Sequence, residues 1–329
     1  MGFKAYILKK AFYSILLIFL VSTLNFIIFR LMPGDPYAVM IREYIMTPEM
    51  IDEVLNRWGL KKPLWEQYLL YIVNLFQGNF GISFRTFRPV QVEIMERLPN
   101  TIALVSCSVI ASTILQVLIG FYIASRRGKL SDSIILSTGI VLNSTPVFWL
   151  GMTLLYFFSF HYHIFPAAGT TTPPPNNPKD PISFIIDYLW HMALPFTALT
   201  AIILGGGIIS VRNLVLDALS QDFVVVARAK GLKERDVLYR HVFKNVQLPI
   251  VTSAAISIAR SVGGAMTTET VFTWYGMGRY TFESISNLDY PSLQGIFFVI
   301  CVLVIVANFI VDVIYGILDP RVKYGESAG

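Results

Sequence analysis

The sequence predicts an all-α integral membrane protein with six transmembrane helices. Of its 329 residues, 54% are hydrophobic and only 14% are charged, whereas soluble domains carry about 25% charged residues. Six apolar runs reach the length of about 20 residues that a helix needs to cross the hydrocarbon core. The basic side chains gather between these runs, as the positive-inside rule expects. The excess of positive charge therefore indicates membrane topology and gives no reason to expect nucleic-acid binding.

The six runs differ little in length and are nearly free of charge. They span residues 11–29, 101–125, 134–160, 191–211, 249–268 and 293–311. The first follows Lys9 and Lys10 and is longer than the apolar core of a secretory signal, and no small-residue cleavage motif comes after it. We therefore expect it to be a retained span. Within the fourth run, "GGGIIS" at 205–210 predicts close packing between helices.

The distribution of Lys and Arg predicts the orientation. Fifteen of them precede, join or follow the spans on one side, whereas the two shorter loops on the other side carry only Lys179 and Arg279. Both termini are therefore expected in the cytoplasm. The long segment between the first two spans exceeds about 60 residues, a length at which loop charge no longer sets orientation.

The long segment at 31–97 is expected to form a small helical extracellular layer on the membrane. In "TPEMIDEVLNRWG", Thr47 suits an N-cap, Pro48 the first helical position and Gly59 the end. A second helix is expected at 63–78 because apolar residues recur at helical spacing. A short amphipathic helix at 88–100 should then lead into the second span.

These expectations divide the chain into four parts. Residues 1–30 form the N-terminal transmembrane helix, and 31–97 form the extracellular helical segment. A five-span core occupies 98–319 and includes a cytoplasmic loop at 212–248. Residues 320–329 form a cytoplasmic tail.

The cytoplasmic loop contains the stretch "ARAKGLKERDVLYRHVFKNVQLPI" at 227–250. A helix is expected at 218–230, a break at Gly231 and a second short helix at 233–245. The second helix carries Val237, Leu238, Val242 and Phe243 at helical spacing, and polar and basic residues cover the rest. Such a helix suits docking into a groove on a cytoplasmic partner. The alternative is a surface helix that rests on anionic headgroups.

This stretch resembles the coupling loop of ABC-transporter permeases, specifically the dipeptide/oligopeptide branch with its D-[YF]-x-x-x-A-R-A-K-G-L pattern. "RLMPGDP", "STPVFWLG", "ETVFTWYGMGRYTF" and "LDPRVKYG" resemble the same branch. The resemblance implies the type I permease fold of ABC importers and assigns contact with an ATPase to a set of loop residues. These are Ala227, Arg228, Ala229, Lys230, Gly231, Leu232, Val237, Leu238, His241, Phe243 and Asn245. Val225 and Val226 depart from the general permease pattern, which has Glu and Ala there.

The resemblance also implies partners. They are a second permease subunit of a different chain, two cytoplasmic ATPase subunits and an extracellular solute-binding protein, assembled in the cell membrane. No phosphate-binding loop of the form G-x-x-x-x-G-K-[ST] occurs, and no catalytic constellation is found. We therefore expect no enzyme activity, and ATP hydrolysis is left to partner chains.

No cofactor or metal site is expected either. Cys107 and Cys301 lie in apolar runs, where they suit packing. His161 and His163 form an H-x-H pair that could bind a metal. Without a carboxylate or thiol near them in sequence, they are better interpreted as interfacial histidines.

A polar stripe in and after the fifth run predicts a translocation path. Arg260, Thr267, Thr268 and Glu269 form this candidate set. Charge inside a membrane is unfavourable, by at least about 2.5 kcal/mol at the bilayer centre, and by default indicates a site or pathway. The alternative is that Glu269 lies at the outer interface, where it caps or pairs.

The sequence thus predicts a permease subunit of an ATP-driven importer for dipeptides, oligopeptides or similar solutes, working by alternating access. A secondary transporter driven by an ion gradient is the alternative. It would need a midplane site with broken helices or internal repeats, and no convincing repeat relates the two halves. A channel would need a filter signature, which the sequence lacks. The solute itself, whether peptide, metal chelate or oligosaccharide, stays open.

Overall fold

The computed structural model describes residues 3–31, 62–174, 176–178 and 180–318; side chains at 3, 31, 259–264 and 314–318 are outside the description. Within these ranges the regular secondary structure is helical, apart from an isolated bridge between Ile82 and Pro89. The helix expected at 47–59 and the tail at 320–329 lie outside the described residues.

The chain up to residue 219 contains three of the four longest apolar helices. In order, its helices are α1 (Phe3–Leu31), α4 (Leu64–Phe76), α5 (Val90–Ala124), α6 (Leu130–Ser144), α7 (Val147–Leu154), the π-helix η1 (Leu155–His161) and α8 (Pro181–Leu219). The second half is more broken and contains α9 (Asp222–Ala229), α10 (Glu234–Asp236), the π-helix η2 (Val237–Val242), α11 (Phe243–Gly264), α12 (Met266–Val271), α13 (Met277–Ser286) and α14 (Tyr290–Leu318).

Four of the described helices, α1, α5, α8 and α14, are long and apolar enough to cross a membrane. They correspond to the first, second, fourth and sixth predicted spans. The fifth run lies mostly in α11, which does not reach the same apolar length among the described residues and ends at Gly264. The count of six spans therefore stays a prediction.

The prediction of one continuous helix over 134–160 is wrong. α6 ends at Ser144, and the helix formed by α7 and η1 departs from it at 98°. Pro146 explains the break, because proline has no N–H to donate and disfavours the helical region for the residue before it. Thr145 is accordingly extended, with φ −77° and ψ 125°. The sequence "STPVF" contained this signal.

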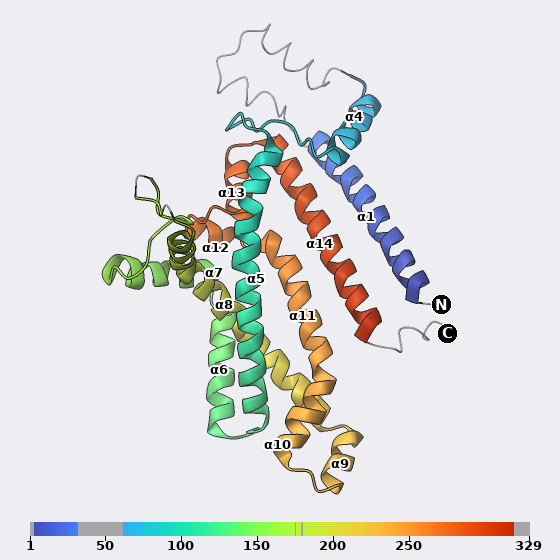
Figure 1. Ribbon diagram of the computed structural model, residues 1–329, viewed down its shortest axis with the longest axis vertical. Coiled ribbons are helices and arrows are strands. Elements are labelled where there is room, and N and C mark those ends of the chain that lie inside the picture. Colours follow the sequence, from blue (N-terminus) through green and yellow to red (C-terminus); the bar gives the residue numbers. More distant parts are fainter. Residues whose placement is uncertain (1–2, 32–61, 175, 179, 319–329) are drawn as a thin grey trace.

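The helices form a bundle around α5, which packs against α8 and α11 (Figure 1). α1 and α14 run antiparallel at one edge of the bundle. Near the first turns of α1, Lys10 Nζ lies 3.0 Å from the Asp312 carboxylate, and the Tyr6 hydroxyl donates to the Asp312 carbonyl at 3.4 Å. The beginning of α1 and the last turns of α14 are thereby joined.

Glycines allow α6 and α5 to approach α8 closely, which confirms the packing expected for "GGGIIS". A Cβ on Gly205 would lie 2.7 Å from the Gly139 carbonyl oxygen of α6. A Cβ on Gly207 would collide with the side chain of Gln116 on α5, whose amide donates to the Ile203 carbonyl at 3.0 Å. A larger residue at Gly205 would therefore force α6 and α8 apart, whereas one at Gly207 would displace the Gln116 side chain from its hydrogen bond.

Beyond the end of α1, α4 confirms the second predicted helix of the extracellular layer. The helix expected at 88–100 is not a separate element, because it forms the first turns of α5, which continues through Pro99. The domain boundary expected between residues 97 and 98 consequently falls inside one helix. α5 therefore runs without interruption from the segment expected to be extracellular into the second predicted span.

Candidate functional site

The loop between α8 and α11, expected on sequence grounds to be cytoplasmic, forms a compact hairpin. α9 ends in a Schellman motif: the Gly231 N–H donates to the Arg228 carbonyl at 2.9 Å, and the Leu232 N–H donates to the Ala227 carbonyl at 3.4 Å. Gly231 has φ +75°, a conformation that glycine adopts without strain. The chain then turns into α10, η2 and α11 without a break, so the second helix expected at 233–245 is the start of a longer one.

The inner face of this hairpin is apolar and packs on the chain itself. Val237 is fully buried, Leu238 is 8% exposed, and Ala227 is 4% exposed. They belong to one cluster with residues of α5, α8 and α11, which also includes Phe121, Ala124, Val211, Val215, Ala218, Val224, Val242, Val246 and Ile250. In this structure Val237 and Leu238 therefore pack on the chain itself and do not form an exposed docking face.

The outer face carries a different apolar group. Val225, Val226 and Leu232 are exposed by 63%, 53% and 39%, on α9 and the turn that follows it. We call these three residues the α9 patch. Arg228, Ala229, Lys230 and Gly231 are exposed around it. The apolar spacing of the second predicted helix favoured that helix as the docking face. The apolar residues of α9 are nevertheless visible in the sequence, within "FVVVARA".

The remaining coupling candidates lie along the edge of the hairpin. Phe243 is 37% exposed, and its ring packs edge-on against Phe121 at 5.8 Å between centroids. His241 and Asn245 are exposed, and the Asn245 amide donates to the His241 carbonyl at 2.9 Å. The Arg228 guanidinium donates twice to Glu234 and lowers the pKa of that carboxyl. Because this ion pair is exposed, its contribution to stability is small.

At the opposite end of the bundle, Glu269 on α12 is fully buried. Its carboxylate accepts hydrogen bonds from the Thr101 hydroxyl of α5 at 2.6 Å and from the Arg279 N–H at 3.0 Å. The same Thr101 hydroxyl accepts from the Met277 N–H at 2.7 Å. Glu269 and Thr101 thus cap the N-terminus of α13, whose first N–H groups have no partner within their own helix. These contacts correspond to the capping interpretation of Glu269.

Neighbouring residues extend this buried network. The Trp274 indole donates to the Asn100 carbonyl at 3.2 Å, and the Asn100 amide donates to the Tyr275 carbonyl at 2.7 Å. The Arg97 guanidinium lies between the rings of Tyr275 and Tyr280, 4.2 and 4.3 Å from their centroids. The loop between α12 and α13 is therefore fixed to α5 by directional contacts.

The other path candidates are dispersed. Thr267 is exposed, whereas Thr268 is 2% exposed and lies on the buried side of α12 with Glu269. The backbone of Arg260 belongs to α11, but its side chain lies outside the described residues. Of the four path candidates, only Thr267 has a side chain that is described and exposed.

Sequence reasoning missed an ion pair that joins α6 to α8. Arg212 Nε and Nη2 donate to the two carboxylate oxygens of Asp132 at 2.7 and 2.8 Å. Asp132 is 3% exposed and also accepts from the Gly128 N–H at 3.0 Å. Arg212 follows Val211, which belongs to the apolar cluster behind the hairpin. Asp132 and Arg212 are 80 residues apart in sequence, so no local pattern could pair them.

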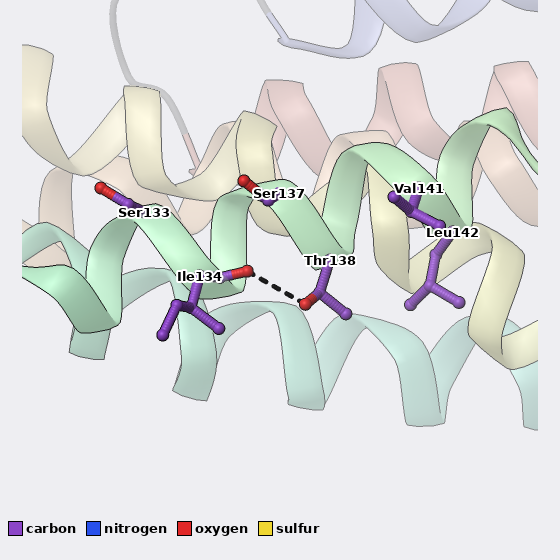
Figure 2. A pocket seen from close by; sticks show the side chains of 6 residues that line it. All are labelled: Ser133, Ile134, Ser137, Thr138, Val141 and Leu142. Atoms are coloured by element: carbon purple, nitrogen blue, oxygen red, sulfur yellow. Dashed lines mark hydrogen bonds between the residues drawn. The ribbon is translucent and has the colours of Figure 1, made fainter.

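The outward face of α6 carries a shallow groove of about 460 Å³. Figure 2 shows its six lining side chains on this one helix: Ser133, Ile134, Ser137, Thr138, Val141 and Leu142. The Thr138 hydroxyl donates back to the Ile134 carbonyl at 3.0 Å, so its hydrogen bond is internal to the helix. None of the six carries a charge.

Among the described residues, no group of three or more His, Cys, Asp or Glu side chains could hold a metal ion. His161 stacks on Tyr156 with 6.5 Å between ring centroids, and its ring meets Tyr162 edge-on. These contacts agree with the interpretation of His161 as an interfacial aromatic.

Comparison with protein families identifies the family of this chain. Residues 116–324 match the family described as binding-protein-dependent transport system inner membrane component, and residues 3–105 match the N-terminal family of the same membrane components. The chain belongs to this family. This confirms the resemblance found in its motifs, and the alternative of a secondary transporter finds no support.

Individual relatives agree with this family membership. The permease is 32% identical over 319 residues to the dipeptide transport system permease protein DppB of Escherichia coli K12, covering 92% of this chain and 94% of the relative. It is 34% identical over 321 residues to the oligopeptide transport system permease protein AppB of Bacillus subtilis, covering 97% and 99%. Pseudomonas aeruginosa has a similar di/tripeptide permease, at 34% identity over 317 residues, covering 92% and 94%.

Among solved structures, an inward-facing form of the MetNI methionine ABC transporter resembles the permease with a TM-score of 0.52. The match covers 69% of this chain and 96% of the other chain, at 14% identity. At this identity the similarity concerns the fold alone. It agrees with the predicted all-α permease fold of ABC importers.

Proposed function

We propose that this chain is a permease subunit of an ATP-driven ABC importer for dipeptides, oligopeptides or similar solutes. Its relatives are named as permeases of dipeptide, di/tripeptide and oligopeptide transport systems. The chain forms half of the translocation path and hydrolyses no ATP itself. A second permease of a different sequence, two cytoplasmic ATPase subunits and an extracellular binding protein complete the transporter. Both termini lie in the cytoplasm, as the asymmetry of Lys and Arg indicates.

The observation that carries the coupling role is the two-sided hairpin at 222–242. One side is packed into the apolar cluster with α5 and α8, and the other exposes the α9 patch. Exposed valines beside basic residues suit a groove on an ATPase subunit, because isolated apolar side chains gain most where a partner excludes water. Motion of the hairpin would pass to the long helices through the cluster behind it.

The revised assignment divides the coupling residues by role. Val225, Val226, Arg228, Ala229, Lys230, Gly231 and Leu232 form the contact surface. Ala227, Val237 and Leu238 support that surface from behind, while His241, Phe243 and Asn245 lie along its edge. On the path side, Thr267 is proposed as a lining residue, and Thr268 and Glu269 as supports of α12. Arg260 stays a proposed path residue on the basis of the sequence alone.

The test is a single charge placed on the α9 patch. Val226→Asp introduces a carboxylate on a 53% exposed side chain, so the chain should fold and insert at normal levels. At the ATPase contact that carboxylate would lose its water without gaining a partner. We expect loss of ATPase co-purification and of solute uptake.

Val226→Ala is the matched control, because it shortens the same side chain without adding charge. It should retain the ATPase subunits and most uptake. If Val226→Asp binds the ATPase subunits and transports as wild type does, α9 is not the contact surface and the proposal fails.

A further inference from the structure

The amphipathic pattern of α4 is inverted relative to that of a helix on a soluble protein. Its buried or half-buried face carries polar groups, among them Tyr68, Tyr71 and Asn74. Its outward face is apolar. The side chains on this face are each exposed by 53–65%, and they are Leu64, Trp65, Leu69, Val73 and Phe76. A helix in water places its apolar stripe against the core. The outward face of α4 therefore fits an apolar environment.

The contacts with α1 place the hydroxyl ends of two α4 tyrosines alongside the last turns of α1. The Tyr68 hydroxyl lies 2.8 Å from the Thr23 hydroxyl, and the Asn25 amide donates to the Tyr71 hydroxyl at 3.2 Å. The candidate membrane span in α1 runs to Arg30. At a rise of about 1.5 Å per residue, Thr23 and Asn25 lie roughly 8–10 Å below that end. Amphipathic helices that lie in a membrane interface place their apolar face about 5–10 Å into the headgroup and acyl boundary.

The turns of α1 that contact α4 also carry exposed apolar side chains. Leu24, Ile27 and Ile28, in the same turns of α1 that contact α4, are exposed by 48%, 41% and 58%. Among the described residues, charge near α4 is found at its beginning, where Lys62 pairs with Glu66 at 3.6 Å, and at Arg30, which lies over the Phe26 ring. Both helices thus carry exposed apolar side chains close to the place where they meet.

We propose that α4 is an interfacial helix immersed in the leaflet at the end of α1, with its outward face in contact with lipid acyl chains. Its polar inner face binds the protein through hydrogen bonds to α1, which are strengthened by exclusion of water. The segment between the first two spans is thus partly membrane-embedded. This assignment does not depend on the solute or on coupling to ATP.

Spin-label accessibility tests the environment of α4 in the full-length chain. With Cys107 and Cys301 replaced by alanine, single nitroxides are placed at positions 69 and 73, at position 28 as the lipid reference and at position 286 as the aqueous reference. Both Ile28 and Ser286 are exposed. The chain is reconstituted in vesicles of phosphatidylethanolamine and phosphatidylglycerol, and collisions with oxygen and with a polar nickel chelate are measured.

Labels at 69 and 73 are expected to match position 28, with high oxygen access and nickel access several-fold below that of position 286. Nickel access equal to that of position 286 would show that α4 lies in water and would overturn the proposal. Low access to both reagents would show that a protein surface covers α4, and would also overturn it. A second measurement uses native Trp65: brominated acyl chains should quench wild-type fluorescence more than that of Trp65→Phe, and equal quenching contradicts lipid contact.

Discussion

At the end of the permease that carries the hairpin at 222–242, the buried contacts are mainly apolar, with the Asp132–Arg212 ion pair beside them. At the opposite end, where α12 and α13 meet α5, a buried hydrogen-bond network is added to apolar packing. Val237 and Leu238 bury aliphatic side chains against α5 and α8. Glu269 and Thr101 instead join the helices by hydrogen bonds to a buried carboxylate and to backbone N–H groups. Both regions are buried, but by different physical means.

The difference bears on what each end is able to do. Apolar packing is non-directional, so aliphatic surfaces tolerate small shifts as long as volume is conserved. A buried hydrogen-bond network is satisfied in one geometry, and breaking one member leaves others without a partner. Under the coupling role proposed above, the apolar packing of the hairpin would allow it to shift against the bundle, whereas the hydrogen bonds of the α12–α13 region favour one geometry.

The largest expected effect comes from charge inside the apolar cluster. Leu238→Asp would bury a carboxylate among aliphatic side chains, which destabilises by more than about 4 kcal/mol unless it is protonated or reaches water. We expect little or no folded permease, measured as the monodisperse fraction in detergent. Leu238→Met is the volume-conserving control and should be close to wild type. Normal levels of folded Leu238→Asp would show that this face is not buried.

A second prediction concerns the polar end. Glu269→Ala leaves the Thr101 hydroxyl and the Arg279 N–H without their acceptor and should lower stability by about 3 kcal/mol. Gly276→Ala should also destabilise, because its Cβ would collide with the Glu269 carboxylate. In the double variant that collision is gone, so the two losses should not add. Melting temperatures of the four proteins measure this; strict additivity would contradict the contact.

The ion pair between α6 and α8 should show a smaller effect. Asp132→Asn and Arg212→Gln each weaken a charge-assisted hydrogen bond, with an expected loss of about 1–3 kcal/mol. Arg212→Lys should recover only part, because lysine cannot donate in the bidentate arrangement of the guanidinium. A double-mutant cycle on melting temperature gives the coupling between the two residues. A coupling energy indistinguishable from zero would mean that the pair does not join the helices.

Much of this fold was accessible from sequence because apolar run length and motif spacing are local signals. They located α1, α5, α8 and α14, and the Gly231 break. The bend at Pro146 was also visible locally, but a continuous apolar run of sufficient length outweighed it in the prediction. At α11 the apolar run is longer than the helix. The run at 249–268, which includes Arg260, reaches the residue before Glu269, whereas α11 ends at Gly264.

The site was less accessible, because burial depends on which helices meet. Val237 and Leu238 have the spacing of a docking face, yet that face packs on α5 and α8 of the same chain. Glu269 is a charged residue next to an apolar run, which predicted a place in the translocation path. In the structure its carboxylate accepts a hydrogen bond from Thr101, which is distant in sequence. The Asp132–Arg212 pair gives no local pattern. Spacing identifies one face of a helix, but it does not say whether that face meets the chain or a partner.

Thiol reactivity at two positions of the hairpin tests the division into an outer and an inner face most directly. In a chain with Cys107 and Cys301 replaced by alanine, Val226→Cys and Val237→Cys are labelled with a polar maleimide, with and without the ATPase subunits. Position 226 is expected to react rapidly alone and several-fold more slowly in the assembled transporter, while position 237 reacts slowly in both. Equal rates at position 226 with and without the ATPase subunits, or rapid labelling of position 237 in the isolated chain, would contradict the account.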